Sequence, residues 1–386
     1  MMSQSRLKKM VLRRGRAIRR SVLKICVLAV LLGLAGRYSA PILQLARLLQ
    51  GLALQRLARA TELITHAAPR PFHIPASNGF VRLLSVVNND AFGTVRFMAD
   101  DVGRFAAHIL PETITTLFRH GKIQRVDAMA LLFARLATPA YYSSLSILFG
   151  WPDSKISDVL HSTAPYLVNR WFACLETPPW LTSSCLRAYN AVINSHGLDD
   201  PLISGFLDGT RREICRPRVA QEFYYNGWLH SHTFLLIAIA FPDGTCMIRG
   251  AEGGRQNDPY ILSSTGLNSD LNNILHGFAV GADAEFSPTP NIRSIQLYQG
   301  ALFDVNKSET YSRNRICVKW LFLIITGSFR YFQCPSEMKI DLTIPVVLYK
   351  AAAILALARN ALYPSQIAQY FGLTPSRHLA TYFPPN

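Results

Sequence analysis

Two acidic motifs between Ile203 and Asp258 constrain the fold of this chain more than any other feature. Asp208 comes at the end of an apolar run that begins at Ile203, and Asp258 follows a predicted hairpin. A carboxylate at the end of a buried strand is costly unless something binds it. Two such aspartates on neighbouring strand ends can share a hard divalent cation. The pattern therefore predicts a metal-dependent nuclease site formed by Asp208 and Asp258.

The periodicity around these motifs predicts an α/β domain over residues 200–386. Apolar runs and the turn at Pro242-Asp243-Gly244 indicate strands and helices in the order β-β-β-α-β-α. The expected strands are 203–207, 229–241, 245–249 and 294–298, and the expected helices start at Pro259 and cover 313–325. This order is that of an RNase H-like fold, a mixed sheet flanked by helices. A C-terminal tail with one helix, 347–360, is expected to pack back on this domain.

The preceding region, residues 85–175, has helical spacing of its apolar residues. Helices are expected over 126–137, 143–149 and from Asp153 to 168, with a tight turn at Gly150. A helix, a turn containing Gly and a second helix are typical of a helix-turn-helix, which would contact DNA through Lys155 and Arg135. The same pattern also fits any small helical domain, so this alternative stays open.

Residues 1–70 form a basic and apolar N-terminal extension. Eight Lys or Arg and no acid occupy the first twenty residues, and an apolar run over 25–36 follows. That run is short for a membrane span, which needs about 20 residues. Nuclear localisation or a DNA-touching tail is the favoured interpretation, and a signal peptide or a transit peptide are the alternatives. Leucines over 42–66 add a basic amphipathic helix, expected to pack on its own domain rather than on a membrane.

Composition and charge agree with a folded protein that binds a polyanion. Of the 386 residues, 49% are hydrophobic and 17% charged, which excludes a disordered chain. The net charge is +16, and the eight N-terminal cations leave +8 on residues 21–386. A basic surface favours nucleic acid or an anionic membrane as partner. The seven cysteines are scattered without a Cys-x-x-Cys motif, so a reducing compartment is the simplest assumption.

Several motifs, taken in order, resemble the Harbinger-type (PIF/Harbinger) DDE superfamily endonucleases, a transposase-derived family. The resemblance covers about residues 85–385 and rests on Leu136–Pro139, Tyr142–Leu145, Gly205–Thr210, Ile214–Pro217, Pro242–Gly244, Glu252–Asp258, Arg315–Trp320 and Tyr370–Gly372. It implies phosphodiester cleavage with two Mg²⁺ or Mn²⁺ ions held by acidic residues, Asp208 and Asp258 among them. It also implies DNA and a Myb-like protein as partners.

Two positions depart from the family pattern. The turn that carries a further Asp in the family has Gly300 and no carboxylate here, and the helical Glu is replaced by Lys319. A unit charge about 4 Å from a divalent ion contributes roughly 8 kcal/mol at an effective dielectric near 20, so this Glu-to-Lys exchange opposes metal binding. We expect Lys319 to pair with Asp208 in place of the cation; Asp304 or Glu309 as substitute ligands are the alternative.

Three hypotheses follow from the sequence. The first is a nuclear, DNA-binding, transposase-derived protein whose nuclease site is impaired. The second is an active divalent-metal endonuclease that uses a substitute carboxylate. The third is a membrane-associated interaction scaffold anchored by residues 1–60, which would place the protein at a membrane or in the secretory pathway.

Overall fold

The computed structural model describes residues 79–86, 95–118, 121–295, 305–363 and 365–384. All of them belong to one compact unit, residues 73–386. The predicted N-terminal extension, residues 1–70, lies outside the described residues. The predictions made for it therefore stay predictions.

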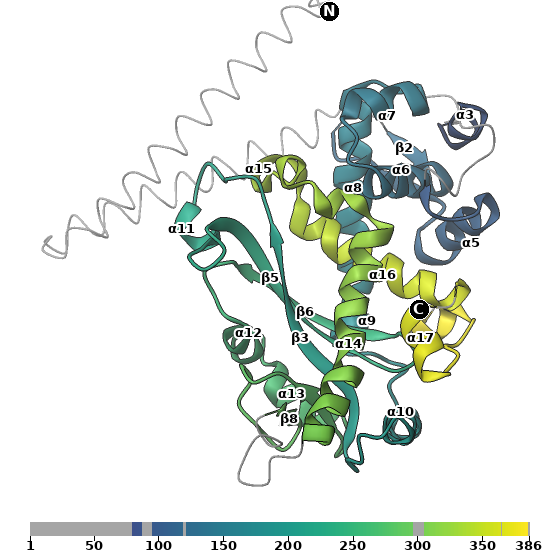
Figure 1. The fold of residues 1–386 in the computed structure, drawn as a ribbon. Helices are drawn as coiled ribbons and strands as arrows, with labels where there is room; N and C mark the ends of the chain where they lie inside the picture. The colour runs from purple at the N-terminus through teal and green to yellow at the C-terminus, as the bar shows by residue number, and fades with distance from the viewer. Residues whose placement is uncertain (1–78, 87–94, 119–120, 296–304, 364, 385–386) are drawn as a thin grey trace, which may run out of the picture. The chain divides into compact units, whose positions relative to one another are not determined.

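A six-stranded mixed sheet forms the centre of this unit (Figure 1). Its middle strand, β3 (Ile203–Glu213), pairs antiparallel with β5 (Ser231–Ala240) and parallel with β7 (Ala279–Ala282). The antiparallel side continues from β5 to β6 (Cys246–Gly253) and β4 (Tyr225–Asn226), and the parallel side continues from β7 to β8 (Ile292–Ser294).

Helices cover both faces of this sheet because successive strand residues point to opposite sides. On one face, Phe206 packs edge-to-face on Tyr311 of α14 (Val305–Ser328). On the other face, Leu207 joins a core formed with α12 (Asp258–Ser264), α13 (Leu267–Ile274) and α10 (Ser183–Ser195). The mixed sheet flanked by helices is compatible with the RNase H-like architecture expected from the sequence.

Strand β7 was absent from the sequence prediction, which placed the strand after the helix at 294–298. The structure has β7 at Ala279–Ala282 and β8 at Ile292–Ser294. The four residues of β7 are small and all buried, because the strand lies between β3 and β8. Such a strand lacks the alternation of apolar and polar residues that reveals strands with one exposed face.

The helical region before the sheet contains the three helices expected there. They are α6 (Arg125–Ala137), α7 (Tyr142–Phe149) and α8 (Asp153–Trp171), and Gly150 ends α7 in the left-handed region with φ of 68°. The region also contains α3 (Gly79–Val86), α5 (Ala99–Ile109), β1 (Thr113–Thr115), β2 (Lys122–Gln124) and α9 (Ala173–Glu176).

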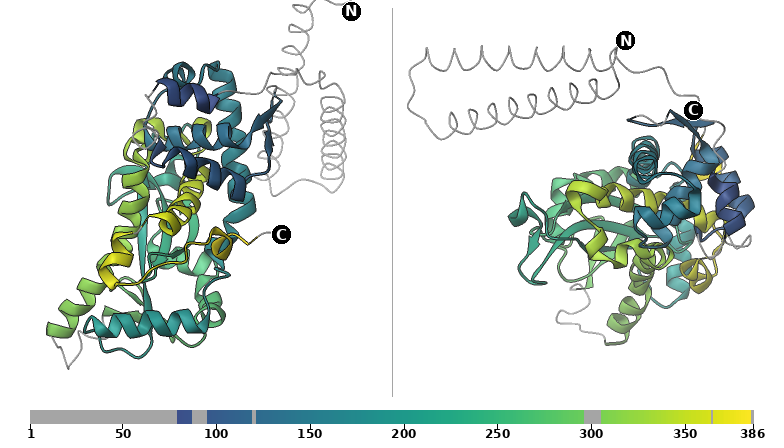
Figure 2. Two further views of the ribbon diagram at one scale, coloured as in Figure 1. Left: turned by 90° about the vertical axis from the view of Figure 1, so that its right-hand side faces the viewer. Right: turned by 90° about the horizontal axis from the view of Figure 1, so that it is seen from above.

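The C-terminal segment joins the helical region to the sheet domain. Helix α16 (Pro345–Leu362) packs against α8, and Figure 2 shows this yellow-green helix beside the blue helices of the earlier region. Among the described helices, α16 alone is long and apolar enough to cross a membrane, but 72% of it is buried inside the protein, as in a core helix. The remaining short elements are α11 (Gln221–Tyr224), η2 (Arg330–Gln333), η3 (Pro335–Glu337), α15 (Ile340–Thr343), α17 (Gln366–Phe371) and α18 (Leu379–Tyr382).

The two cations predicted to contact DNA, Arg135 and Lys155, are buried, with exposed fractions of 1% and 5%. Arg135 donates to the Ala140 carbonyl oxygen, pairs with Glu337 at 3.3 Å and lies over the Tyr331 ring. The Lys155 ammonium lies 4.0 Å from the centre of the Trp151 ring. Neither side chain can reach a phosphate in this structure, which corrects their assignment as DNA contacts.

We predict that Arg135→Ala lowers the free energy of unfolding by about 3 kcal/mol. Removal of one partner of a buried ion pair leaves the other charge without compensation. Arg104→Ala is the matched control, because Arg104 is 63% exposed in its pair with Asp101 and should change stability by less than about 1 kcal/mol. Urea denaturation measures both variants, and equal effects would contradict a structural role for Arg135.

Candidate active site

Asp208 lies on the α14 face of β3. The pairing of β3 with β5 is unbroken from Phe206 to Glu213, so side chains alternate regularly and Asp208 points to the same face as Phe206. The carboxylate is buried, and its Oδ1 accepts a hydrogen bond of 3.0 Å from the Gly209 N–H. Its Oδ2 lies 3.4 Å from Nη1 of Arg315 on α14.

Asp258 lies on the opposite face of β3. A Cβ atom at Gly209 would overlap its carboxylate, and Gly209 points away from the Asp208 face. The partner of Asp258 is Arg211, the next residue on that second face, with Nη2 2.8 Å from Oδ1. The expectation that Asp208 and Asp258 share one cation is therefore not met, because the backbone of β3 separates them.

The carboxylate that accompanies Asp208 is Asp283, which the sequence analysis missed. It directly follows β7, the parallel neighbour of β3. Phe206 pairs with Gly281, and the same register continued by two residues brings Asp283 beside Asp208. Arg315 Nη1 lies 3.6 Å from Asp283 Oδ2, so one guanidinium contacts both carboxylates. The signal in the sequence was a second case of the first motif: an Asp at the end of a short apolar run.

Helix α14 is fixed against the ends of β7 and β8 by a buried tyrosine. The Tyr311 hydroxyl lies 2.7 Å from the carbonyl oxygen of Ala282 and 2.6 Å from that of Arg293. Arg315 is four residues further along the same helix, so it projects from the same side of α14 as Tyr311. This anchoring explains why the guanidinium reaches the two strand ends.

Lys319 does not have the position expected for it. It is exposed on α14, one turn beyond Arg315, and forms no ion pair with Asp208 in the described part of the chain. Its charge still lowers the pKa of Asp208, but Arg315 has the larger effect. The cation that compensates Asp208 is therefore Arg315. Glu309 is exposed on the same helix, and Gly300 and Asp304 lie outside the described residues.

Burial dominates the titration of both aspartates. Burial raises the pKa of Asp208, while Arg315 lowers it and Asp283 raises it. Burial also raises the pKa of Asp258 to about 6, against the opposing effect of Arg211. The charges of Glu285, Asp208 and Asp283 raise it further.

The donor set does not fit a divalent metal centre as it stands. Within the described ranges, three or more acidic, histidine or cysteine side chains nowhere come together in a way that could hold an ion. The two carboxylates on the α14 face share a guanidinium, which occupies the space that a cation between them would need. No metal-dependent step is derived from this arrangement.

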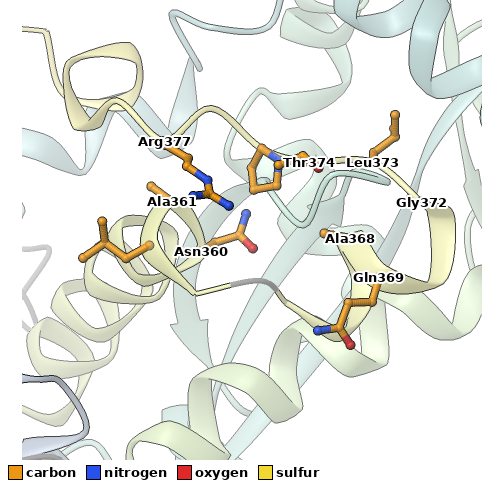
Figure 3. Close-up of a pocket in the computed structure, with 10 residues that line it drawn as sticks. Asn360, Ala361, Ala368, Gln369, Gly372, Leu373, Thr374 and Arg377 are labelled. Carbon is orange, nitrogen blue, oxygen red and sulfur yellow. The ribbon is translucent and has the colours of Figure 1, made fainter.

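A cavity of about 250 Å³ lies away from these carboxylates, between α16 and the segment after α17 (Figure 3). Its lining includes the polar residues Asn360, Gln369 and Thr374 and the cation Arg377, and none of its lining residues is acidic. It therefore contributes no ligand to the carboxylate site.

Comparison with known proteins supports a nuclease fold for this domain. Residues 207–356 match the DDE superfamily endonuclease family. The matched segment begins just before Asp208 and contains Asp258, Asp283, Arg315 and Lys319. The match supports a transposase-derived DDE nuclease domain, a family that generally uses divalent metal and acts on DNA. No curated protein and no solved structure matches the chain significantly.

The raised pKa of Asp258 predicts a specific pH dependence of stability. A folded-state pKa of about 6, above the ordinary 3.8, favours the protonated carboxyl, so the stability contributed by this group falls as pH rises from about 4 to about 6. Asp258→Asn should lack this decline. The free energy of unfolding of Asp258→Asn minus that of the unaltered protein should increase by up to about 3 kcal/mol as pH rises from about 4 to about 6, and should stay constant above pH 7.

Urea denaturation at a series of pH values measures this difference. The pKa of Asp127 is also raised to about 6, but this residue is present in both proteins, so its contribution cancels from the difference in stability. Glu222→Gln, at an exposed acid, controls for the loss of one negative charge. A constant difference between Asp258→Asn and the unaltered protein from pH 4 to 7 would contradict the assigned shift.

Proposed function

We propose that this chain is a transposase-derived, DNA-binding protein with a DDE nuclease fold whose phosphodiester-cleaving site is impaired. The observation that carries the proposal is the position of Arg315 between Asp208 and Asp283. Lys319 adds a second cation at the helical position where the resembling family has a Glu. Asp283 supplies the carboxylate that was expected at Gly300, so only the helical acid is without a counterpart.

Electrostatics explain why this arrangement opposes metal binding. A divalent ion about 4 Å from a fixed unit cation is disfavoured by roughly 8 kcal/mol at an effective dielectric near 20. Displacement of Arg315 would relieve this repulsion, but it would leave the buried Asp208 and the partly buried Asp283 without their compensating charge. The ion therefore competes with a cation that the fold itself supplies.

DNA is the proposed partner because the matched family acts on it and the chain is basic. The net charge of +16 gives affinity for phosphates that decreases steeply with salt. Membership of the Harbinger group, a Myb-like partner and a nuclear location belong to the same proposal and rest on the sequence resemblance. The helix-turn-helix interpretation is supported by the α7–Gly150–α8 arrangement, although the DNA-facing residues would have to be others than Arg135 and Lys155.

We predict that the purified protein binds supercoiled plasmid, that this binding weakens as salt increases, and that the plasmid is not nicked in Mg²⁺ or Mn²⁺.

We also predict that a double variant, Arg315→Ala with Lys319→Glu, gains Mn²⁺ affinity by at least tenfold in calorimetric titration, because it removes two cations and restores one acid. Arg313→Ala, at an exposed cation on the same helix, is the matched control and should leave metal affinity unchanged.

Metal-dependent cleavage is the second candidate function, and the observation that favours it is the closeness of Asp208 and Asp283. Plasmid nicking by the unaltered protein that is lost in both Asp208→Ala and Asp283→Ala would overturn the impaired site. Retention of that nicking in Asp258→Asn would agree with the position of Asp258 on the other face. Absence of DNA binding even at low salt would contradict the DNA-binding part of the proposal.

A further inference from the structure

The ribbon formed by β3 and β5 continues past the candidate site and ends in an exposed aromatic tip. β7 pairs with β3 as far as Phe206, whereas β5 stays paired with β3 to Glu213. Glu213 is five steps along β3 from Asp208, which is about 17 Å at about 3.3 Å per residue. In Figure 1, α11 lies at one end of β5 and β8 lies near the opposite end of the sheet.

Trp228 stands at this tip and is 88% exposed. It belongs to the turn between β4 and β5, which pair through Tyr225 with His232 and through Asn226 with Ser231. The other tryptophans are placed differently: Trp151, Trp171 and Trp180 are at most 8% exposed, and the Trp320 ring packs on Tyr370. Trp228 is thus the one tryptophan among the described residues that is largely exposed to solvent, while Trp320 is partly buried.

The turn that presents Trp228 is held by a buried side chain. Asn226 is 8% exposed, and its Oδ1 accepts hydrogen bonds from the N–H groups of Trp228 at 3.1 Å and Leu229 at 2.8 Å. Its Nδ2 donates to the carbonyl oxygen of Gly254 at 2.7 Å, which ties the turn to the end of β6. A fixed backbone reduces the entropy lost when the indole binds a partner.

The surroundings of Trp228 combine aromatic rings with arginines. Phe223 and Tyr225 are 42% and 41% exposed, and Arg216 and Arg218 are exposed in the same segment. Glu213 and Glu222 are exposed acids at this end of the ribbon, and Asp341 accepts a hydrogen bond from the Arg218 backbone N–H. Exposed aromatic side chains that follow exposed arginines in one segment offer both base stacking and phosphate contacts, the combination that binds single-stranded nucleic acid.

We propose that residues 216–230 form a DNA contact in which the Trp228 indole stacks on an unpaired or unstacked base. Arg216 and Arg218 contact the phosphates beside it. The strand from Asp208 to Glu213 alone corresponds to about five nucleotides at about 3.4 Å per step, and the turn that carries Trp228 lies beyond this end of the strand. One DNA molecule of more than about five nucleotides can therefore extend from the carboxylate site to the tip. This inference rests on the proposed DNA-binding function and specifies a base-stacking residue for it.

Fluorescence and binding titrations of the full chain test the inference, with a duplex that carries a single-stranded overhang and a blunt duplex as probes. Trp228 emission should be quenched by the overhang probe. Trp228→Ala should weaken binding of that probe about tenfold, as expected for one base–aromatic stack, and affect the blunt duplex less. Trp228→Phe should keep most of the affinity, and the salt dependence of Trp228→Ala should equal that of the unaltered protein because the indole carries no charge.

Phe118→Ala is the matched control, since Phe118 is 73% exposed on a different turn and should not alter binding. If the unaltered protein binds the overhang probe but Trp228→Ala binds equally well and no quenching occurs, the stacking proposal is overturned while the proposed function stands. If a self-associated form dissociates on Trp228→Ala without a change in DNA affinity, the tip is a protein interface and the proposal fails. Absence of DNA binding at low salt overturns both.

Discussion

One guanidinium compensates a buried and a partly buried carboxylate at the centre of this sheet. Asp208 and Asp283 end up side by side because β3 and β7 are parallel neighbours, and their mutual repulsion requires a cation. Arg315 supplies it from α14, whose position is fixed by Tyr311 against the ends of β7 and β8. In the site that we propose to be impaired, the charge that stabilises the fold there also opposes a metal ion.

The alternation of side chains along β3 separates two charged clusters that lie close in space. Asp208 and Arg315 occupy the α14 face, whereas Asp258 and Arg211 occupy the α12 face. Gly209 allows this arrangement, since any side chain there would overlap the Asp258 carboxylate. Asp258 thus packs against β3 from the face opposite Asp208, and the charges of Asp208 and Asp283 raise its pKa.

Helices and strands with a clear periodic spacing of apolar and polar residues could be predicted from the sequence. A strand that is buried on both faces lacks this spacing and could not. The helices around Gly150, the long strand β5 and the helix that carries Arg315 were recognised from their periodicity. The strand β7 was not, because its four small residues are buried on both faces, and Asp283 was missed with it. The burial of Arg135 could not be predicted either, since its partner Glu337 is brought to it only by tertiary packing. The partner of Lys155, Trp151, is only four residues away, but the sequence pattern did not show that this turn is buried.

Anomalous diffraction from crystals of the described unit soaked in Mn²⁺ tests the central claim most directly. The account predicts no anomalous peak between the Asp208 and Asp283 carboxylates, with the Arg315 guanidinium within about 4 Å of both, as an ion pair requires. A peak at that position, with Arg315 displaced toward solvent, would contradict it. Such a result would favour the second candidate function, a metal-dependent endonuclease.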